Sequence, residues 1–434
     1  MNDSPAPQGV ARVVWVSFAL ASVVFHIGLV FSGLVPNLVS RPVHLIFVLP
    51  WVLIWGRQGM ALWSGVALCA VGVAAAAWVA LSHDALADQY GFLEGDLQVW
   101  IAAALICVVL EAARRAIGWP LPLVALTALL YGLFGQHIPG RFGHSGTPLE
   151  SFLGTLTIAE GGLWGTLTAV SVNVVAIFVI FGAVLNAGEA GQGFMNVASA
   201  AAGRLRGGAA KVSVLSSALF GSISGSASAN VASTGAITLP AMERLGYPKR
   251  IAAAVEAVAS SGGQIMPPLM GAGAFVMVEL TGVPYTGIMA AAALPALLYF
   301  WAVWVGIDGY ARRFDLRGLA KEDRPDARAV LITSGFFLVP FAVLLWGMFG
   351  LSVTPQYAAC LAIMVAAILL LIGADLRFDF NRATQRGEAA LMAAGRQVAL
   401  IGSIIFCASL VIGVLGVTGL GVKITSLILS VSGG

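Results

Sequence analysis

Charged residues are scarce in this sequence, and cysteine is scarcer still. Only 10% of the 434 residues are Asp, Glu, Lys or Arg, whereas soluble domains carry about 25%. Because 59% of the residues are hydrophobic, the chain has too little polar surface for a soluble globular protein. The composition predicts an all-α polytopic membrane protein. The net charge of +3 is too small to indicate binding to nucleic acid.

Cysteine and histidine give no sign of a metal centre or a catalytic triad. The four cysteines lie inside apolar runs, and neither their spacing nor that of the five histidines is typical of metal ligands. The sequence shows neither a phosphate-binding loop nor a nucleophile–base pair, so it does not indicate an enzyme. We expect the cysteines to be small hydrophobes that lie within the membrane and the histidines to lie at the membrane interface.

Apolar runs that approach about 20 residues, the length a helix needs to cross a bilayer, recur along the chain. Ten such runs are candidate spans: Val13–Leu34, Val43–Trp55, Leu62–Ser82, Val99–Ala113, Ile117–Phe134, Leu163–Ala187, Tyr285–Ile307, Ala329–Gly350, Tyr357–Ala374 and Gln397–Val417. A cytoplasmic N-terminus places five groups of basic residues inside, as the positive-inside rule requires. These are Arg57; Arg114 and Arg115; Arg204, Arg206 and Lys211; Arg312 to Arg328; and Arg377 to Arg396. Residues 211–250 must then enter and leave on the same side.

The segment 211–245 has the pattern of a re-entrant helical hairpin. Its centre, GSISGSASANVASTG between Gly221 and Gly235, contains almost no bulky side chain. The apolar arm on each side has about a dozen residues, too few to cross a hydrocarbon core of about 30 Å. Irregular backbone at that depth is tolerated only where it is buried in protein or lines a cavity. The tip therefore predicts a binding site, although small residues also permit close helix packing.

A break interrupts the next helical segment, 249–281. The sequence SSGGQIMPP places Gly262 and Gly263, which free the backbone, before Pro267 and Pro268, which cannot donate hydrogen bonds. Carbonyl groups at the break then lose their helical partners. The alternative is a simple proline kink. A hairpin tip beside a broken helix is the arrangement with which secondary transporters hold anions and Na⁺.

Two short stretches suggest an internal repeat of opposite orientation. AGQGFMNVAS at 190–199 and TGLGVKITSL at 418–427 both follow a long apolar run and begin with a small residue and Gly-x-Gly. The loop charges give the preceding runs opposite directions. The repeats would be 117–307, with the hairpin and the broken helix, and 329–434, which would be incomplete. A second hairpin and break would lie beyond Gly434, so we expect either a fragment or another chain that supplies them.

The sixty residues from Gly221 to Leu280 closely resemble the large membrane subunit of tripartite ATP-independent periplasmic (TRAP) transporters. The motif SGGQIMPP is similar to sequences of the TAXI branch, in which small and large membrane subunits are commonly fused. Residues 1–116 look like a four-helix small-subunit scaffold, and residues 117–434 look like the large-subunit transport region. The resemblance implies an elevator-type transporter with inverted repeats in a bacterial or archaeal inner membrane. It also implies Na⁺-coupled import of a small organic acid or dicarboxylate that a periplasmic TAXI-type substrate-binding protein delivers.

The resemblance further implies site residues. Backbone carbonyls of the tip and the break would hold the coupling Na⁺: Ser224, Gly225, Ser226, Gly262, Gly263, Pro267 and Pro268. Ser228, Asn230 and Gln264 would face the substrate. Glu256 lies within the membrane, where carboxylates are costly and commonly functional; it either tunes a Na⁺ or proton path or pairs with Ser and Asn groups of the hairpin. The alternative to a transporter is a non-transporting scaffold, or a partial subunit that needs another chain.

Overall fold

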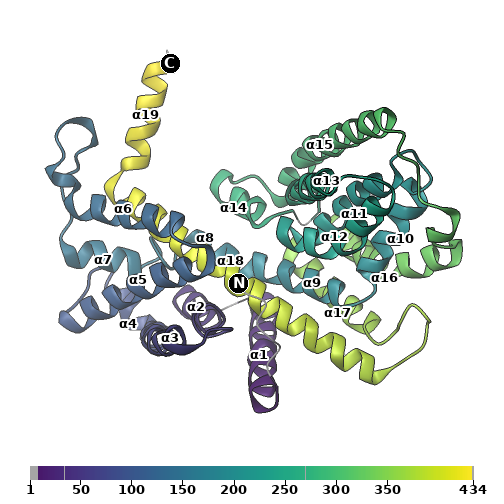
Figure 1. The fold of residues 1–434 in the computed structure, drawn as a ribbon. Helices are drawn as coiled ribbons and strands as arrows, with labels where there is room; N and C mark the ends of the chain where they lie inside the picture. Colours follow the sequence, from purple (N-terminus) through teal and green to yellow (C-terminus); the bar gives the residue numbers. More distant parts are fainter. Residues whose placement is uncertain (1–7, 34, 269, 433–434) are drawn as a thin grey trace. The chain divides into compact units, whose positions relative to one another are not determined.

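The computed structural model describes residues 8–33, 35–268 and 270–432 (Figure 1). Over these residues the chain is helical, and its β structure is limited to one isolated bridge between Ile372 and Phe378. Seven of the described helical segments are long and apolar enough to cross a membrane. The prediction of an all-α polytopic membrane protein is confirmed.

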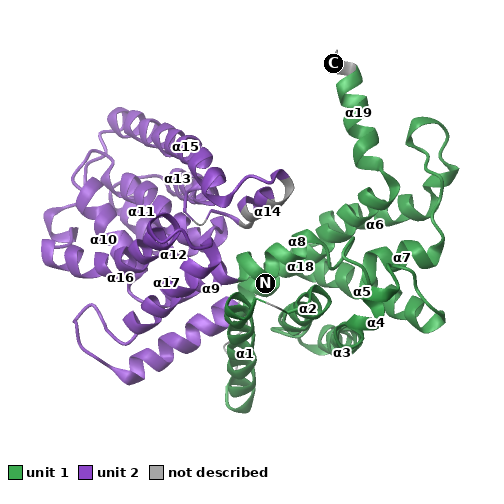
Figure 2. Cartoon of the chain, turned by 180° about the vertical axis from the view of Figure 1, so that it is seen from behind, with its two compact units in different colours: residues 1–176, 395–434 green, residues 177–394 purple. Residues whose placement is uncertain are grey.

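The helices form two compact units, residues 1–176 with 395–434 and residues 177–394 (Figure 2). In unit 1 the helices are α1 (Val10–Ser32), α2 (Asn37–Leu53), α3 (Gly59–Leu81), α4 (His83–Asp88), α5 (Asp96–Ile117), α6 (Pro120–Phe134), α7 (Leu149–Thr157), α8 (Thr166–Val170), the π-helix η3 (Ser171–Val175) and α19 (Leu420–Ser432). In unit 2 they are α9 (Ala176–Ala187), α10 (Ala190–Ala202), α11 (Gly208–Ser224), α12 (Ala227–Arg244), α13 (Lys249–Gly262), the 3₁₀ turn η4 (Gly263–Ile265), α14 (Ala272–Thr281), α15 (Tyr285–Arg313), α16 (Ala327–Leu345), the π-helix η6 (Trp346–Gly350) and α17 (Pro355–Leu369). Helix α18 (Phe380–Thr418) begins in unit 2 and ends in unit 1.

The two units divide the chain differently from the predicted regions 1–116 and 117–434. Helix α7, which follows residue 117, packs against chain that precedes it: a Cβ on Gly154 would lie 2.2 Å from the carbonyl oxygen of Gly91. The assignment of residues 1–116 as a small-subunit scaffold stays a prediction. The two stretches that suggested a repeat form α10 and α19, each 13 residues long, and their inverted relation also stays a prediction.

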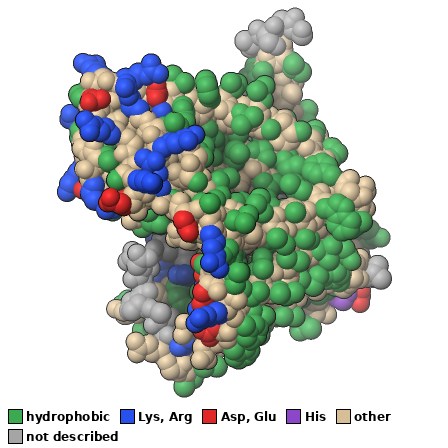
Figure 3. All heavy atoms as spheres, turned by 90° about the vertical axis from the view of Figure 1, so that its right-hand side faces the viewer, with side chains coloured by type: hydrophobic (Ala, Val, Ile, Leu, Met, Phe, Trp, Pro, Cys, Tyr) green, Lys and Arg blue, Asp and Glu red, His purple; other side chains and the backbone are tan. Residues whose placement is uncertain are grey.

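The long helices leave apolar side chains uncovered. Five residues of α15 are each more than half exposed: Leu294, Leu297, Leu298, Trp301 and Val305. Figure 3 shows broad areas of hydrophobic side chains, with Lys and Arg gathered apart from them. Apolar surface of this extent needs a lipid environment to cover it. Each of the ten predicted spans coincides largely with a helix.

Two histidines that we expected at the membrane interface lie inside unit 1. His26 on α1 and His44 on α2 are fully buried, so the expectation is wrong for both. His26 Nδ1 lies 2.6 Å from the Ser22 carbonyl oxygen, and His26 Nε2 lies 2.8 Å from His44 Nδ1. His44 Nε2 lies 3.0 Å from Ser171 Oγ. The Ser22 carbonyl can only accept, so His26 Nδ1 must donate to it. If both rings are neutral, His44 Nδ1 then donates to His26 Nε2, and the Ser171 hydroxyl donates to His44 Nε2.

Substitution of His44 by Phe is expected to lower the free energy of unfolding by about 2 kcal/mol. The change leaves the Ser171 hydroxyl and His26 Nε2 buried without their partner, and an unsatisfied buried group costs about 1–3 kcal/mol. His137→Phe is the control, because His137 is exposed and should shift stability by less than about 0.5 kcal/mol. Denaturation in detergent measures the free energy of unfolding of both variants. Equal losses would contradict a structural role for the His26–His44 pair.

Candidate functional site

The predicted hairpin is present as two helices joined by a two-residue turn. Helix α11 ends at Ser224 and α12 begins at Ala227. Gly225 has φ 58°, a left-handed conformation that favours glycine. Ser226 caps α12, since its Oγ accepts a hydrogen bond from the Ala229 N–H at 3.3 Å. The arms have 17 and 18 residues, more than the dozen or so expected, because the small residues beside the turn continue both helices.

The predicted break is also present. A turn of 3₁₀-helix, η4, and a short loop separate α13 from α14. The Gly271 N–H donates to the Gln264 carbonyl oxygen at 2.7 Å and closes this loop. The Pro267–Pro268 peptide bond is cis, and the carbonyl oxygen of Pro268 accepts from the Tyr285 hydroxyl. The helical hydrogen bonds are therefore interrupted between α13 and α14, so the segment is broken and not merely kinked at a proline.

The hairpin tip lies directly against the break. A Cβ on Gly221 would lie 2.1 Å from Gly263 Cα, and one on Gly225 would lie 2.0 Å from the Met270 carbonyl oxygen. Backbones this close admit only glycine at the contact. The structure thus brings the tip and the break together: Gly263 lies against Gly221, and Gly225 lies against Met270 and Gly271. Coordination of Na⁺ by the predicted residues stays a prediction.

Four helix ends meet at this junction: α11 and α13 end there, and α12 and α14 begin there. Free carbonyls at helix C-termini favour cations, and free N–H groups at N-termini favour anions. The carbonyls of Gln264 and Pro268 already accept one hydrogen bond each, but each carbonyl oxygen has two lone pairs. Carbonyl oxygens are ligands of the kind that hard cations take, and the assignment of Na⁺ and its ligands stays a prediction.

The three residues predicted to face the substrate lie in different surroundings. Ser228 and the Gln264 side chain are exposed, so both can be reached from outside the unit. Asn230 is fully buried. Its Nδ2 donates to the carbonyl oxygen of Ser217 at 2.8 Å and lies 3.5 Å from that of Ser260. Asn230 therefore holds α12 against α11 and α13, and substrate contact by the three residues stays a prediction.

Glu256 on α13 is 1% exposed and is surrounded by hydroxyl groups from three helices. Ser213 Oγ on α11 donates to Glu256 Oε2 at 2.8 Å. Thr234 and Thr238 on α12 also donate to the carboxylate, and Ser260 Oγ lies 3.5 Å from Oε1. Of the two interpretations left open for Glu256, an ion path or pairing with the hairpin, the structure shows the pairing with the hairpin.

An ion pair with a buried lysine holds the base of the hairpin. Lys211 on α11 is 4% exposed, and its Nζ lies 2.5 Å from Asp308 Oδ1 on α15. The same ammonium group lies 5.0 Å from the centre of the Trp304 ring. Arg312 donates to the second carboxylate oxygen at 2.7 Å. The hairpin is thus fixed to α15 at its base and to the break at its tip.

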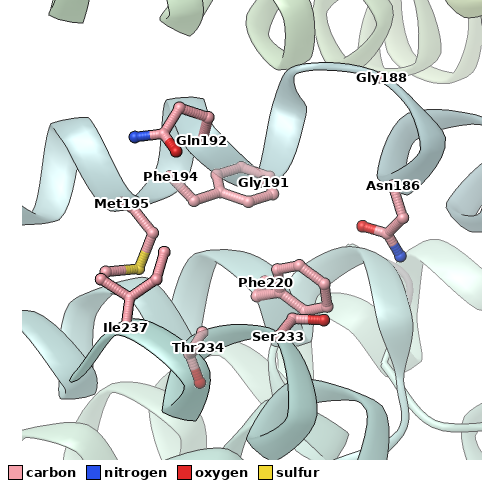
Figure 4. A pocket seen from close by; sticks show the side chains of 10 residues that line it. All are labelled: Asn186, Gly188, Gly191, Gln192, Phe194, Met195, Phe220, Ser233, Thr234 and Ile237. Carbon is pink, nitrogen blue, oxygen red and sulfur yellow. The ribbon is translucent and has the colours of Figure 1, made fainter. Parts of the chain in front are cut away.

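A cavity of about 250 Å³ lies beside the hairpin in unit 2 (Figure 4). Helices α9 to α12 and the turn after α9 supply its walls: Asn186, Gly188, Gly191, Gln192, Phe194, Met195, Phe220, Ser233, Thr234 and Ile237. The residues predicted for the site do not line this cavity. Sequence reasoning missed it because no motif marks the wall, which the fold assembles from separate helices.

Comparison with known proteins identifies the family. Residues 104–434 match the model of the DctM component of tripartite ATP-independent periplasmic transporters. The chain is 28% identical over 209 residues to the C4-dicarboxylate TRAP transporter large permease protein DctM of Pseudomonas aeruginosa, covering 47% of this chain and 48% of that relative. It is 27% identical over 284 residues to the isethionate TRAP transporter permease protein DctMQ of Oleidesulfovibrio alaskensis, covering 59% of this chain and 44% of that relative.

The chain spans about half the length of these relatives, so their activities and substrates are not assigned to it. Each match covers about half of the relative's own length or less. The family consists of transporter permeases and not of enzymes, and it works with a periplasmic substrate-binding protein and membrane subunits. Because the family model covers more than half of the sequence, the chain belongs to the DctM family of TRAP transporter membrane components.

Proposed function

We propose that this chain is a membrane subunit of a TAXI-type TRAP transporter that imports a small organic acid or dicarboxylate, driven by Na⁺. A periplasmic TAXI-type substrate-binding protein delivers the cargo. The meeting of four helix ends where the hairpin tip touches the break carries the proposal, because it offers carbonyl ends to a cation beside N–H ends for a carboxylate. Names of relatives that mention C4-dicarboxylates and isethionate support an anionic cargo.

Unit 2 is the moving part in this proposal, and unit 1 is the scaffold. The hairpin, the break and the cavity all belong to residues 177–394. A site built inside one compact unit can travel as a rigid body, as an elevator mechanism requires. The positive-inside pattern supports a cytoplasmic N-terminus in the inner membrane of a bacterium or archaeon.

Reconstitution in liposomes tests the proposal. The chain is combined with its binding protein, and uptake of a labelled dicarboxylate is measured under an inward Na⁺ gradient. We expect uptake that disappears when K⁺ replaces Na⁺ or when the binding protein is left out. Uptake that needs neither would overturn the proposal. Uptake that appears only with a second chain bearing another hairpin would favour the partial-subunit alternative.

Substitution of Ser226 by Ala is expected to raise the Na⁺ concentration for half-maximal uptake by about tenfold, the equivalent of about 1.4 kcal/mol. The reason is that Ser226 sits at the tip, where a hydroxyl can add to the carbonyl ligands. Loss of the α12 cap should also cost about 1 kcal/mol of stability. Ser226→Thr keeps a hydroxyl and is the control. An unchanged Na⁺ requirement in Ser226→Ala would show that the ion lies elsewhere.

A further inference from the structure

The C-terminal end of α15 brings basic side chains next to apolar surface that needs a lipid environment. We propose that this end of unit 2 binds an anionic phospholipid, whose phosphate group lies among basic residues on three loops and whose acyl chains lie along α15. The inference goes beyond the proposed function, because it concerns a membrane lipid and neither the cargo nor the coupling ion. It rests on the packing of the loops, on a tyrosine hydroxyl without a partner and on the exposed face of α15.

Two of the loops are held together beside the end of α15: residues 203–208 and 314–319. The Leu319 N–H donates to the Gly203 carbonyl oxygen at 2.8 Å. A Cβ on Gly318 would lie 2.8 Å from the carbonyl oxygen of Arg204. Because Arg317 directly precedes Gly318, this close contact places the backbones of Arg204 and Arg317 next to each other.

A buried tyrosine on the third loop, residues 246–250, has a hydroxyl group without a partner. Tyr247 is 4% exposed, and among the residues that the structure describes its Oη has no hydrogen-bond partner. A Cβ on Gly207 would lie 2.8 Å from this Oη and 2.8 Å from Ala311 Cβ on α15, so the hydroxyl lies at the first loop and at the end of α15. A buried donor without an acceptor costs free energy. A phosphate oxygen at Gly207 would accept its hydrogen bond and remove that cost.

Five basic residues on the three loops are exposed, and we call them the basic cluster: Arg204, Arg206, Lys249, Arg250 and Arg317. Within the described part of the chain, none of their side chains forms an ion pair or a hydrogen bond. The loops carry one acidic residue, Asp315. Helices α11 and α13 begin at these loops without a side-chain cap, so the positive ends of two helix dipoles add to the charge. Such an arrangement favours a phosphate group.

The exposed apolar face of α15 leads towards the basic cluster. Four side chains on it, each more than half exposed, follow one another at spacings of three or four residues: Leu294, Leu298, Trp301 and Val305. The same spacing continues through Gly309 to Arg313 at the end of the helix. Arg313 Cζ lies 5.7 Å from the centre of the Phe314 ring, which is 54% exposed. An apolar face that ends in cations matches a molecule with acyl chains and an anionic head, so charge complementarity favours a phospholipid over a soluble phosphate.

Native mass spectrometry of the purified full chain in detergent tests the proposal. Dioleoyl phosphatidylglycerol is titrated into the protein, and dioleoyl phosphatidylcholine, which has the same acyl chains and no net charge, is titrated in parallel. We expect phosphatidylglycerol to bind about tenfold more tightly. Equal affinity for the two lipids would overturn the proposal. Displacement of phosphatidylglycerol by inorganic phosphate alone would also overturn it, because the site would then take a soluble anion.

Single substitutions locate the site. Arg204→Gln and Arg317→Gln should each weaken binding of phosphatidylglycerol about fivefold. Arg377→Gln is the matched control, because Arg377 is an exposed arginine of unit 2 that lies outside the three loops. It removes the same charge and should change the affinity by less than about twofold. Equal losses in all three variants would show that the lipid responds to net charge alone, and would overturn the proposal.

Tyr247→Phe tests the position of the phosphate group. The change removes only the hydroxyl, and we expect it to weaken binding of phosphatidylglycerol about threefold. The melting temperature of the lipid-free protein should not fall, because the hydroxyl has no partner there. An unchanged affinity would overturn the placement of the phosphate at Gly207.

Discussion

Replacement of Gly221 by Ala is expected to lower the stability of the protein by about 3 kcal/mol, at the upper end of overpacking costs. The added Cβ would lie 2.1 Å from Gly263 Cα, so two backbones would have to move apart. No rotamer change can relieve this clash, because backbone atoms and not the end of a flexible side chain oppose it. The same movement would pull the hairpin tip from the break, so transport should be lost as well.

The matched control for this variant is Gly306→Ala. Gly306 lies inside α15, and a Cβ there would have no atom within 4 Å outside its own helix. Alanine is favoured over glycine in a helix by about 1 kcal/mol, so this variant should melt at or above the wild-type temperature. Thermal unfolding in detergent compares the two. A Gly221→Ala protein that melts with the wild type would show that the tip and the break are not in tight contact.

Replacement of Asn230 by Asp is expected to destabilise the protein by about 2–3 kcal/mol. The change exchanges the Nδ2 donor for an acceptor that faces the Ser217 carbonyl oxygen at 2.8 Å. Asn230 is fully buried, and within the described residues its Oδ1 has no hydrogen-bond partner. A carboxylate in its place would therefore be both repelled and unpaired.

Gln264→Glu makes the same amide-to-acid change on an exposed side chain, directly after Gly263, at which an added Cβ would lie 2.8 Å from Asn230 Nδ2. We expect it to change stability by less than about 0.5 kcal/mol and to weaken uptake of an anionic cargo if Gln264 faces the substrate. Comparison of the melting temperatures of the two variants shows whether an amide-to-acid change is costly because the amide is buried and hydrogen-bonded, as at Asn230, or costly even on an exposed side chain. Equal losses of stability would contradict the assignment of Asn230 to the packing of the hairpin.

Local signals made the hairpin and the break predictable. The run of small residues at Gly221–Gly235 and the stretch from Gly262 to Pro268 each determine backbone conformation within a few residues. Glycine does so by freeing the backbone, and proline by removing a hydrogen-bond donor. The lengths of the arms were underestimated because Ser and Ala were interpreted as part of the turn, whereas both are compatible with helix once neighbours supply packing.

Long-range features were not predictable from the sequence. The contact of His26 with His44 joins residues on different helices, and no spacing rule relates them. The cavity wall is assembled from four helices. The burial of Asn230, which we expected to face the substrate, depends on which side of α12 meets α11 and α13. Each of these follows from tertiary packing, which a single sequence without an alignment does not specify.

The histidine pair has a consequence for how α1 sits in a bilayer. Within Val10–Ser32, all of which the structure describes, burial is confined to Ala19, Ser22 and His26. Lipid chains cover apolar side chains as well as protein would, so hydrophobic burial alone sets no preferred rotation about the helix axis. The hydrogen bond from His44 to His26 favours one, since a turned helix would leave His26 Nε2 and His44 Nδ1 without a partner. This polar contact acts together with the ring contacts of Trp15, Phe18 and Phe25 on α2 to determine which side of α1 faces the lipid.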